Sequence, residues 1–217
     1  RKIILYTRKY FNDHEGHILS KTDRAFVFSI FKGGIKLDIK KIVYTAFFIA
    51  LGIVLPMVFH LVGGPSLGRV FLPMHLPVLI GGAFLGPMAG LIIGIITPLL
   101  SSLFTGMPPV IPMLPIMIAE LGIYGLVMGY FFFKIKMNVY LSLIISMFAG
   151  RIMASLVVLA LVYGFGFARL PANPIIYIYG TITAGFPGII GQLLIVPLVL
   201  RYIRRFNEQK PTLETAY

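Results

Sequence analysis

The stretch LPVLIGGAFLGPMAGLIIGIITPLLSSLF, residues 76–104, decides how often this chain crosses a membrane. It holds 29 residues and not one charged side chain. A transmembrane helix needs about 20 residues, so the stretch is longer than one ordinary span. The pair Gly86-Pro87 interrupts it, and Gly-Pro is a strong turn signal. The stretch is therefore either one long tilted helix or two short helices that meet at Gly86-Pro87.

The composition is that of an integral membrane protein. Hydrophobic residues make up 58% of the 217 residues and charged residues 12%, against roughly 25% charged in soluble domains. The mean hydropathy is +0.94. The absence of cysteine excludes disulfides, thiolate metal sites and cysteine nucleophiles. The net charge of +12 comes from basic residues gathered at the two ends, which indicates membrane orientation rather than nucleic-acid binding.

The positions of the basic residues decide between one helix and two over residues 76–104. Basic residues favour the cytoplasmic side of a membrane. Two helices there make six spans with both termini cytoplasmic, and 16 Lys and Arg then lie inside against two outside. One helix would make five spans and divide them 11 to 7. We therefore predict an all-α bundle of six transmembrane helices over residues 42–62, 74–86, 88–104, 111–133, 138–163 and 174–203.

The remaining segments are loops and tails. The outer loops 63–73, 105–110 and 164–173 are rich in Gly and Pro, and they either cap a substrate cavity or simply reverse the chain. The domain boundaries follow: a cytoplasmic basic arm over 1–40, the transmembrane domain over 41–205, and a cytoplasmic tail over 206–217. The arm is either an interfacial helix near 22–33 or a polar extension.

The inventory of reactive side chains argues against an enzyme. Glu120 is the one acidic residue between Asp38 and Glu208, so a catalytic carboxylate pair is excluded from the spans. No Gly-rich phosphate loop with a Lys is present, so the chain does not hydrolyse ATP unaided. His14 and His17 lack further ligands for a metal. We expect neither a metal nor a cofactor.

Glu120 and Arg151 fall near the centres of the fourth and fifth predicted spans. A charge at that depth costs several kcal/mol, so both side chains should face the interior of the bundle. Consecutive antiparallel helices can bring them together. The pair is then either architectural, fixing how the helices pack, or part of a ligand site.

Two further patterns have an ordinary and a functional interpretation. Small residues four apart, such as Ala46 and Ala50, let helix backbones approach closely, and most such pairs serve internal packing. Tyr163, Tyr177 and Tyr179 lie near the outer boundary, where they form an aromatic belt or line a pocket.

Three stretches carry a resemblance to a known family. They are Thr45–Gly52, Pro73–Pro87 with Gly90-Leu91 after it, and Ser101–Pro109. With the six predicted spans, they resemble the S component, the substrate-binding membrane subunit, of energy-coupling-factor (ECF) vitamin transporters, most closely the pantothenate branch. The resemblance covers residues 41–205, and the basic arm departs from the compact family pattern.

The resemblance implies a transport function in a prokaryotic cytoplasmic membrane. An S component captures a water-soluble vitamin at the outer face and topples in the bilayer to deliver it inward. It docks through an Ala-x-x-x-Ala motif, here Ala46 and Ala50, on a transmembrane coupling subunit, the T component, with two cytoplasmic ATPases. No nucleic acid is implied.

The same resemblance points to pantothenate, whose carboxylate would suit a cation. Arg151, Arg69 and Arg169 are the candidate cations, and Glu120, His75, Asn173 and Tyr177 complete the expected substrate site. Nicotinate or a biotin-like acid would also suit an arginine, and cobalamin, riboflavin or a thiamine precursor stay open. The alternative is a small structural or channel-forming membrane protein in which Glu120 and Arg151 are architectural.

Overall fold

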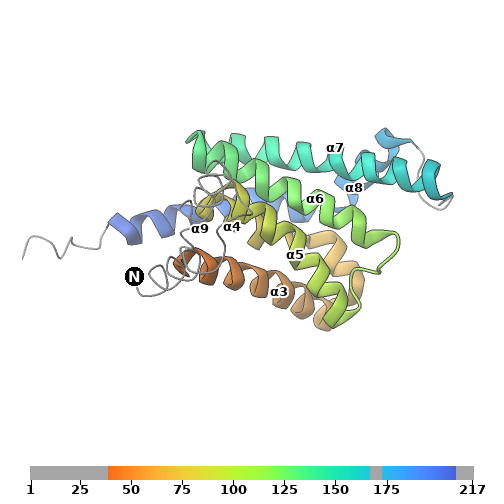
Figure 1. Ribbon diagram of the computed structural model, residues 1–217, viewed down its shortest axis with the longest axis horizontal. Helices are drawn as coiled ribbons and strands as arrows, with labels where there is room; N and C mark the ends of the chain where they lie inside the picture. Colours follow the sequence, from red (N-terminus) through yellow and green to blue (C-terminus); the bar gives the residue numbers. More distant parts are fainter. Residues whose placement is uncertain (1–38, 167–172, 209–217) are drawn as a thin grey trace, which may run out of the picture. The chain divides into compact units, whose positions relative to one another are not determined.

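The computed structural model describes residues 39–166 and 173–208, and within these ranges the chain forms helices and no strand (Figure 1). The expected arm over 1–38, with its interfacial helix and the pair His14 and His17, lies outside the described residues, as do Arg169 and the tail from residue 209. The helices are α3 (Ile39–Phe71), α4 (His75–Leu85), α5 (Pro87–Thr105), α6 (Met113–Met128), the π-helix η1 (Gly129–Lys134), α7 (Val139–Phe165), α8 (Pro174–Ala184) and α9 (Phe186–Glu208).

Five of the described helices are long and apolar enough to cross a membrane. They begin at Ile39, Pro87, Met113, Val139 and Phe186. The prediction of an all-helical, multi-pass membrane protein is therefore confirmed. The count of six spans and the cytoplasmic position of both termini stay predictions. The undecided segment is α4, whose 11 residues extend about 16 Å at 1.5 Å per residue.

The turn expected at Gly86-Pro87 is confirmed. Helix α4 ends at Leu85, and α5 begins at Pro87. Gly86 has a φ of 95°, a backbone conformation that favours glycine because it has no Cβ. Proline suits the first position of the next helix, where its missing N–H is not needed. The long apolar stretch thus forms two helices.

Two predicted segments differ from the structure. The first helix ends where expected, at a break over Gly63 and Gly64, but helical structure then resumes and continues to Phe71, so most of the expected 63–73 loop is helical. Gly64, with a φ of 69°, supplies the left-handed conformation at that break.

The expected helix over 174–203 is also not continuous, because it breaks at Gly185 into α8 and α9. The break has a local cause. Gly185 lies outside helical geometry, and Pro187, which lacks an N–H, suits the first turn of a new helix.

Glycines allow α5 and α6 to pack with their backbones in contact. A Cβ added at Gly90 would meet the carbonyl oxygen of Gly125, and one added at Gly94 would meet that of Leu121. A Cβ at Gly129 would meet the backbone at Gly86-Pro87. These small-residue pairs therefore serve internal packing, as small residues do where membrane helices meet.

Helices α5, α6 and α7 lie side by side in chain order (Figure 1). Fully buried apolar side chains fill the core between the helices, among them Val78, Leu79, Ile93, Leu121 and Leu143. The contact between α6 and α7 brings the middle of one helix against the middle of the next, and the two membrane-depth charges lie there.

Candidate functional site

Glu120 of α6 and Arg151 of α7 form a buried ion pair. The Nη1 atom of Arg151 lies 2.8 Å from Oε1 of Glu120. Glu120 is 4% exposed and Arg151 is 7% exposed, so neither charge faces lipid. The expectation that these residues face each other inside the bundle is confirmed. Charge-assisted bonds of this length are among the strongest that side chains form.

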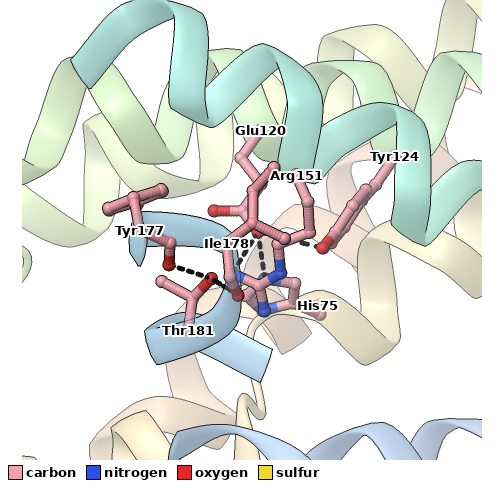
Figure 2. A network of polar contacts seen from close by, with 7 residues as sticks. All are labelled: His75, Glu120, Tyr124, Arg151, Tyr177, Ile178 and Thr181. Carbon is pink, nitrogen blue, oxygen red and sulfur yellow. Dashed lines mark hydrogen bonds and ion pairs between the residues drawn. The ribbon is translucent and has the colours of Figure 1, made fainter. Parts of the chain in front are cut away.

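Two more side chains converge on the same carboxylate oxygen (Figure 2). The hydroxyl of Tyr124 donates a hydrogen bond to Oε1 of Glu120 at 2.9 Å. Nε2 of His75 lies 3.7 Å from that oxygen. Tyr124 stands four residues after Glu120, one helical turn along the same face. Its ring fits against α7 because position 150 is glycine, where a Cβ would meet that ring.

His75, the first residue of α4, is buried without a hydrogen bond. It is 3% exposed, and neither ring nitrogen has a hydrogen-bond partner among the described residues. The distance of 3.7 Å to Glu120 exceeds that of an ordinary N–H···O bond. A buried polar group without a partner is costly. The ring therefore has hydrogen-bonding capacity that a bound molecule could use.

Glu120, His75 and Arg151 form part of the wall of a cavity of about 330 Å³. Small-molecule sites usually measure about 300–1,000 Å³ and combine an apolar wall with a few polar groups, and this cavity has both. The other polar side chains described on its wall are His60, Ser101, Tyr177 and Thr181. Its apolar wall includes Pro56, Leu72, Pro73, Met74, Met107, Pro108, Pro109, Met113, Ile116, Met117 and Ala184.

Two serine side chains hold the loop between α5 and α6 against this cavity. The hydroxyl of Ser101 donates to the carbonyl oxygen of Met107 at 2.7 Å, and that of Ser102 donates to Pro108 at 2.7 Å. Both serines are buried in the last turns of α5. Met107, Pro108 and Pro109 line the cavity. This Gly/Pro-rich loop thus forms part of the cavity wall.

Helix α8 contributes one face to the same wall. Tyr177, Gly180, Thr181 and Ala184 line the cavity, and their spacing of three and four residues places them on one side of a helix. The hydroxyl of Thr181 donates to the carbonyl oxygens of Tyr177 and Ile178, both at 3.0 Å (Figure 2). Tyr177 therefore lies at the cavity, whereas Tyr163 and Tyr179 are exposed.

The structure separates the expected site residues into two groups. Arg151, Glu120, His75 and Tyr177 line one cavity. Asn173 does not line it: the exposed Asn173 side chain caps α8 by accepting a hydrogen bond from the backbone N–H of Ile175 at 2.9 Å. The side chain of Arg69 and the whole of Arg169 are not among the parts of the chain that the structure describes.

Sequence reasoning missed Tyr124 and the methionines of the cavity. The spacing of Tyr124 from Glu120 was an available signal, because residues four apart share a helix face. The four lining methionines, Met74, Met107, Met113 and Met117, come from three separate segments. No local pattern could have grouped them. Over the described residues, no cluster of three or more His, Asp or Glu could hold a metal ion.

A comparison with known families assigns the chain. The family described as ECF transporter, substrate-specific component, matches residues 40–200. The chain belongs to this family. No curated protein and no solved structure matched it. The matched range contains the whole cavity wall. ECF substrate-specific components are transporter subunits rather than enzymes, and they work with a coupling subunit and ATPases.

The two alanines expected to dock the ECF coupling subunit lie on an open face of α3. Ala46 and Ala50 are both exposed, whereas Phe48 and Gly52 on the same helix are buried. Phe48 belongs to the main hydrophobic core. The alanines therefore do not pack against the described part of the chain, and among those residues nothing covers their face.

Proposed function

We propose that this chain is the substrate-capturing S component of an ATP-dependent ECF importer in a prokaryotic cytoplasmic membrane. It binds a water-soluble vitamin or vitamin precursor in the 330 Å³ cavity, and pantothenate is the first compound to test because of the sequence resemblance. Arg151, Glu120, His75 and Tyr177 contact the substrate. Ala46 and Ala50 dock on the T component, which joins it to two ATPases.

The observation that carries the proposal is the position of the polar cluster. Ionisable groups at membrane depth are expensive and usually mark a ligand pathway or a relay. Here Glu120 and Arg151 lie on the wall of a cavity rather than in a closed helix interface, together with His75, whose ring makes no hydrogen bond within the described residues. A purely architectural pair would need no such space beside it.

Cavity-filling substitutions test whether this space holds the substrate. Gly180 lines the cavity, and a Cβ added there meets no atom within 4 Å. Gly180→Leu should therefore fold and abolish vitamin binding by the purified protein. Gly191→Leu on α9 is the matched control, since Gly191 also has open space around it but does not line the cavity. Equal binding by both variants would place the substrate elsewhere.

Copurification separates the transporter from a channel-forming or structural protein. After mild detergent extraction, an S component should bring down a coupling subunit with ATPases, or retain a vitamin that mass spectrometry identifies. A binding isotherm with radiolabelled pantothenate then tests the first candidate directly. Extraction that yields the chain alone, without ligand and without binding to any vitamin offered, would contradict the proposal.

A further inference from the structure

The ionisable groups of the cavity balance one another. Among the side chains that the structure describes, its wall carries one carboxylate, Glu120, and one guanidinium, Arg151, in contact at 2.8 Å. The other titratable side chains described on the wall are His60, His75 and Tyr177. The charges of Glu120 and Arg151 cancel, so over the described side chains a ligand that enters the cavity meets an ion pair rather than an unshared cation.

A charged ligand would fit this balance poorly. A carboxylate that enters a largely apolar cavity loses its water, and an unshared cation would offset that loss far better than a cation already paired with another carboxylate. Arg151 already directs Nη1 at Glu120, and a second carboxylate beside it would repel the first. An ammonium group would face the matching difficulty at Arg151. An uncharged molecule avoids both penalties.

The rest of the wall suits an uncharged molecule with an apolar body. The methionines Met74, Met107, Met113 and Met117 present flexible thioethers, which adapt to irregular shapes and make favourable contacts with aromatic rings. The unpartnered nitrogens of His75 can serve as one donor and one acceptor. The guanidinium of Arg151 has five N–H donors, and the ion pair engages Nη1.

We propose that the cavity selects an uncharged ligand, which places its apolar part on the methionines and its polar groups on His75 and Arg151. This inference rests on the proposed function of the cavity as the substrate site. It departs from pantothenate, which is a carboxylate, in favour of a vitamin or precursor without an ionised group.

Matched pairs of compounds test the role of charge. Pantothenate is compared with its alcohol, pantothenol, and nicotinate with its amide, nicotinamide; riboflavin serves as a larger uncharged vitamin. Binding is measured on the purified full chain in lipid nanodiscs at about pH 8, where histidine side chains are ordinarily uncharged. We expect the uncharged member of a pair to bind at least about tenfold more tightly, or riboflavin to bind where neither acid does.

Substitution of Glu120 tests the cause. Glu120→Gln removes the negative charge and frees the guanidinium, so the ratio of the two dissociation constants should move toward the carboxylate by at least about tenfold. Glu120→Asp keeps the charge and should keep the preference for the uncharged member. Both constants come from one preparation, so a change in the folded fraction does not alter their ratio. The comparison of charged and uncharged compounds on the unsubstituted chain tests the inference even if a variant fails to fold.

The outcomes separate this inference from the proposed function. A carboxylate that binds more tightly than its uncharged partner would overturn the charge selection and support the substrate site. A ratio of the two dissociation constants that Glu120→Gln leaves unchanged would also overturn the charge selection and leave the substrate site supported. Binding of no vitamin at all, or binding that Gly180→Leu does not affect, would overturn the assignment of the cavity and the inference with it.

Discussion

The buried ion pair allows a double-mutant test of what holds α6 to α7. Arg151→Met replaces the guanidinium with an apolar side chain of similar length, and Glu120→Gln replaces the carboxylate with an uncharged amide. Each single variant leaves one buried charge without its partner, because both side chains are less than 10% exposed. The double variant leaves no charge there. The free energy of unfolding of the double variant therefore separates the interaction energy of the pair from the cost of one buried charge without a partner.

The distance sets the size of the effect. Unit charges 2.8 Å apart attract by about 6 kcal/mol at an effective dielectric constant of about 20. Desolvation of the two ions offsets most of this, which is why an intact buried pair adds little net stability. Removal of one partner leaves the desolvation cost uncompensated, so each single variant should lose about 3–5 kcal/mol. The double variant should lose less than the sum by about 2–3 kcal/mol.

The assay is reversible unfolding of each purified variant in mixed micelles, with ligand binding measured in parallel. Losses that add within about 0.5 kcal/mol would show that the two charges do not interact and would refute the reasoning. Binding adds a second criterion. A purely architectural pair predicts that the double variant recovers binding with stability. A substrate contact at Arg151 predicts a folded double variant that does not bind.

Three other variants or fusions test the packing, the docking face and the topology. Ala46→Leu should abolish vitamin uptake in cells but leave binding by the isolated chain intact, whereas Ala160→Leu at an exposed position of α7 should leave uptake unchanged. Gly125→Ala should lower stability by about 1–3 kcal/mol in the unfolding assay, because its Cβ meets backbone. Gly122→Ala should cost less, since its Cβ would make ordinary contacts with side chains. A reporter fused after Tyr217 should be active only if it is a cytoplasmic reporter, and an active periplasmic reporter would exclude six spans.

Much of the fold could be predicted because local chemistry determines it. A Gly-Pro pair inside an apolar stretch stops one helix and starts another, and α4 and α5 meet at that pair. The long helices follow from apolar length alone. The end of the first helix at Gly63 and Gly64 was predicted, but the helical segment that follows it was not. The break at Gly185 was not predicted either, because glycine is common within membrane helices. Whether it interrupts one depends on what packs against it.

The site could be predicted only where the free-energy cost of placing a charge in lipid leaves few possible arrangements of the side chains. A lone acid and a lone base at one depth in consecutive helices have few ways to avoid lipid, and Glu120 and Arg151 do pair. The cavity is different, since its described wall comes from six helices, the loop after α5 and the connection between α3 and α4. Asn173 is a second case in which the sequence did not show whether a residue lines the cavity. Its place before Pro174 is typical of a helix cap, and this local role occupies its side chain.

On the proposed function, helix α3 carries both part of the cavity wall and the face expected to dock on the coupling subunit. Pro56 and His60 of this helix line the cavity, while Ala46 and Ala50 lie exposed nearer its start. Ten residues separate Ala46 from Pro56, which is about 15 Å along a helix. Phe48 and Gly52 pack between these positions, and a Cβ at Gly52 would meet the side chain of Thr97 on α5. Because no non-helical residue interrupts α3 before Gly63, we expect a partner that shifts its alanine face to shift the cavity wall as well.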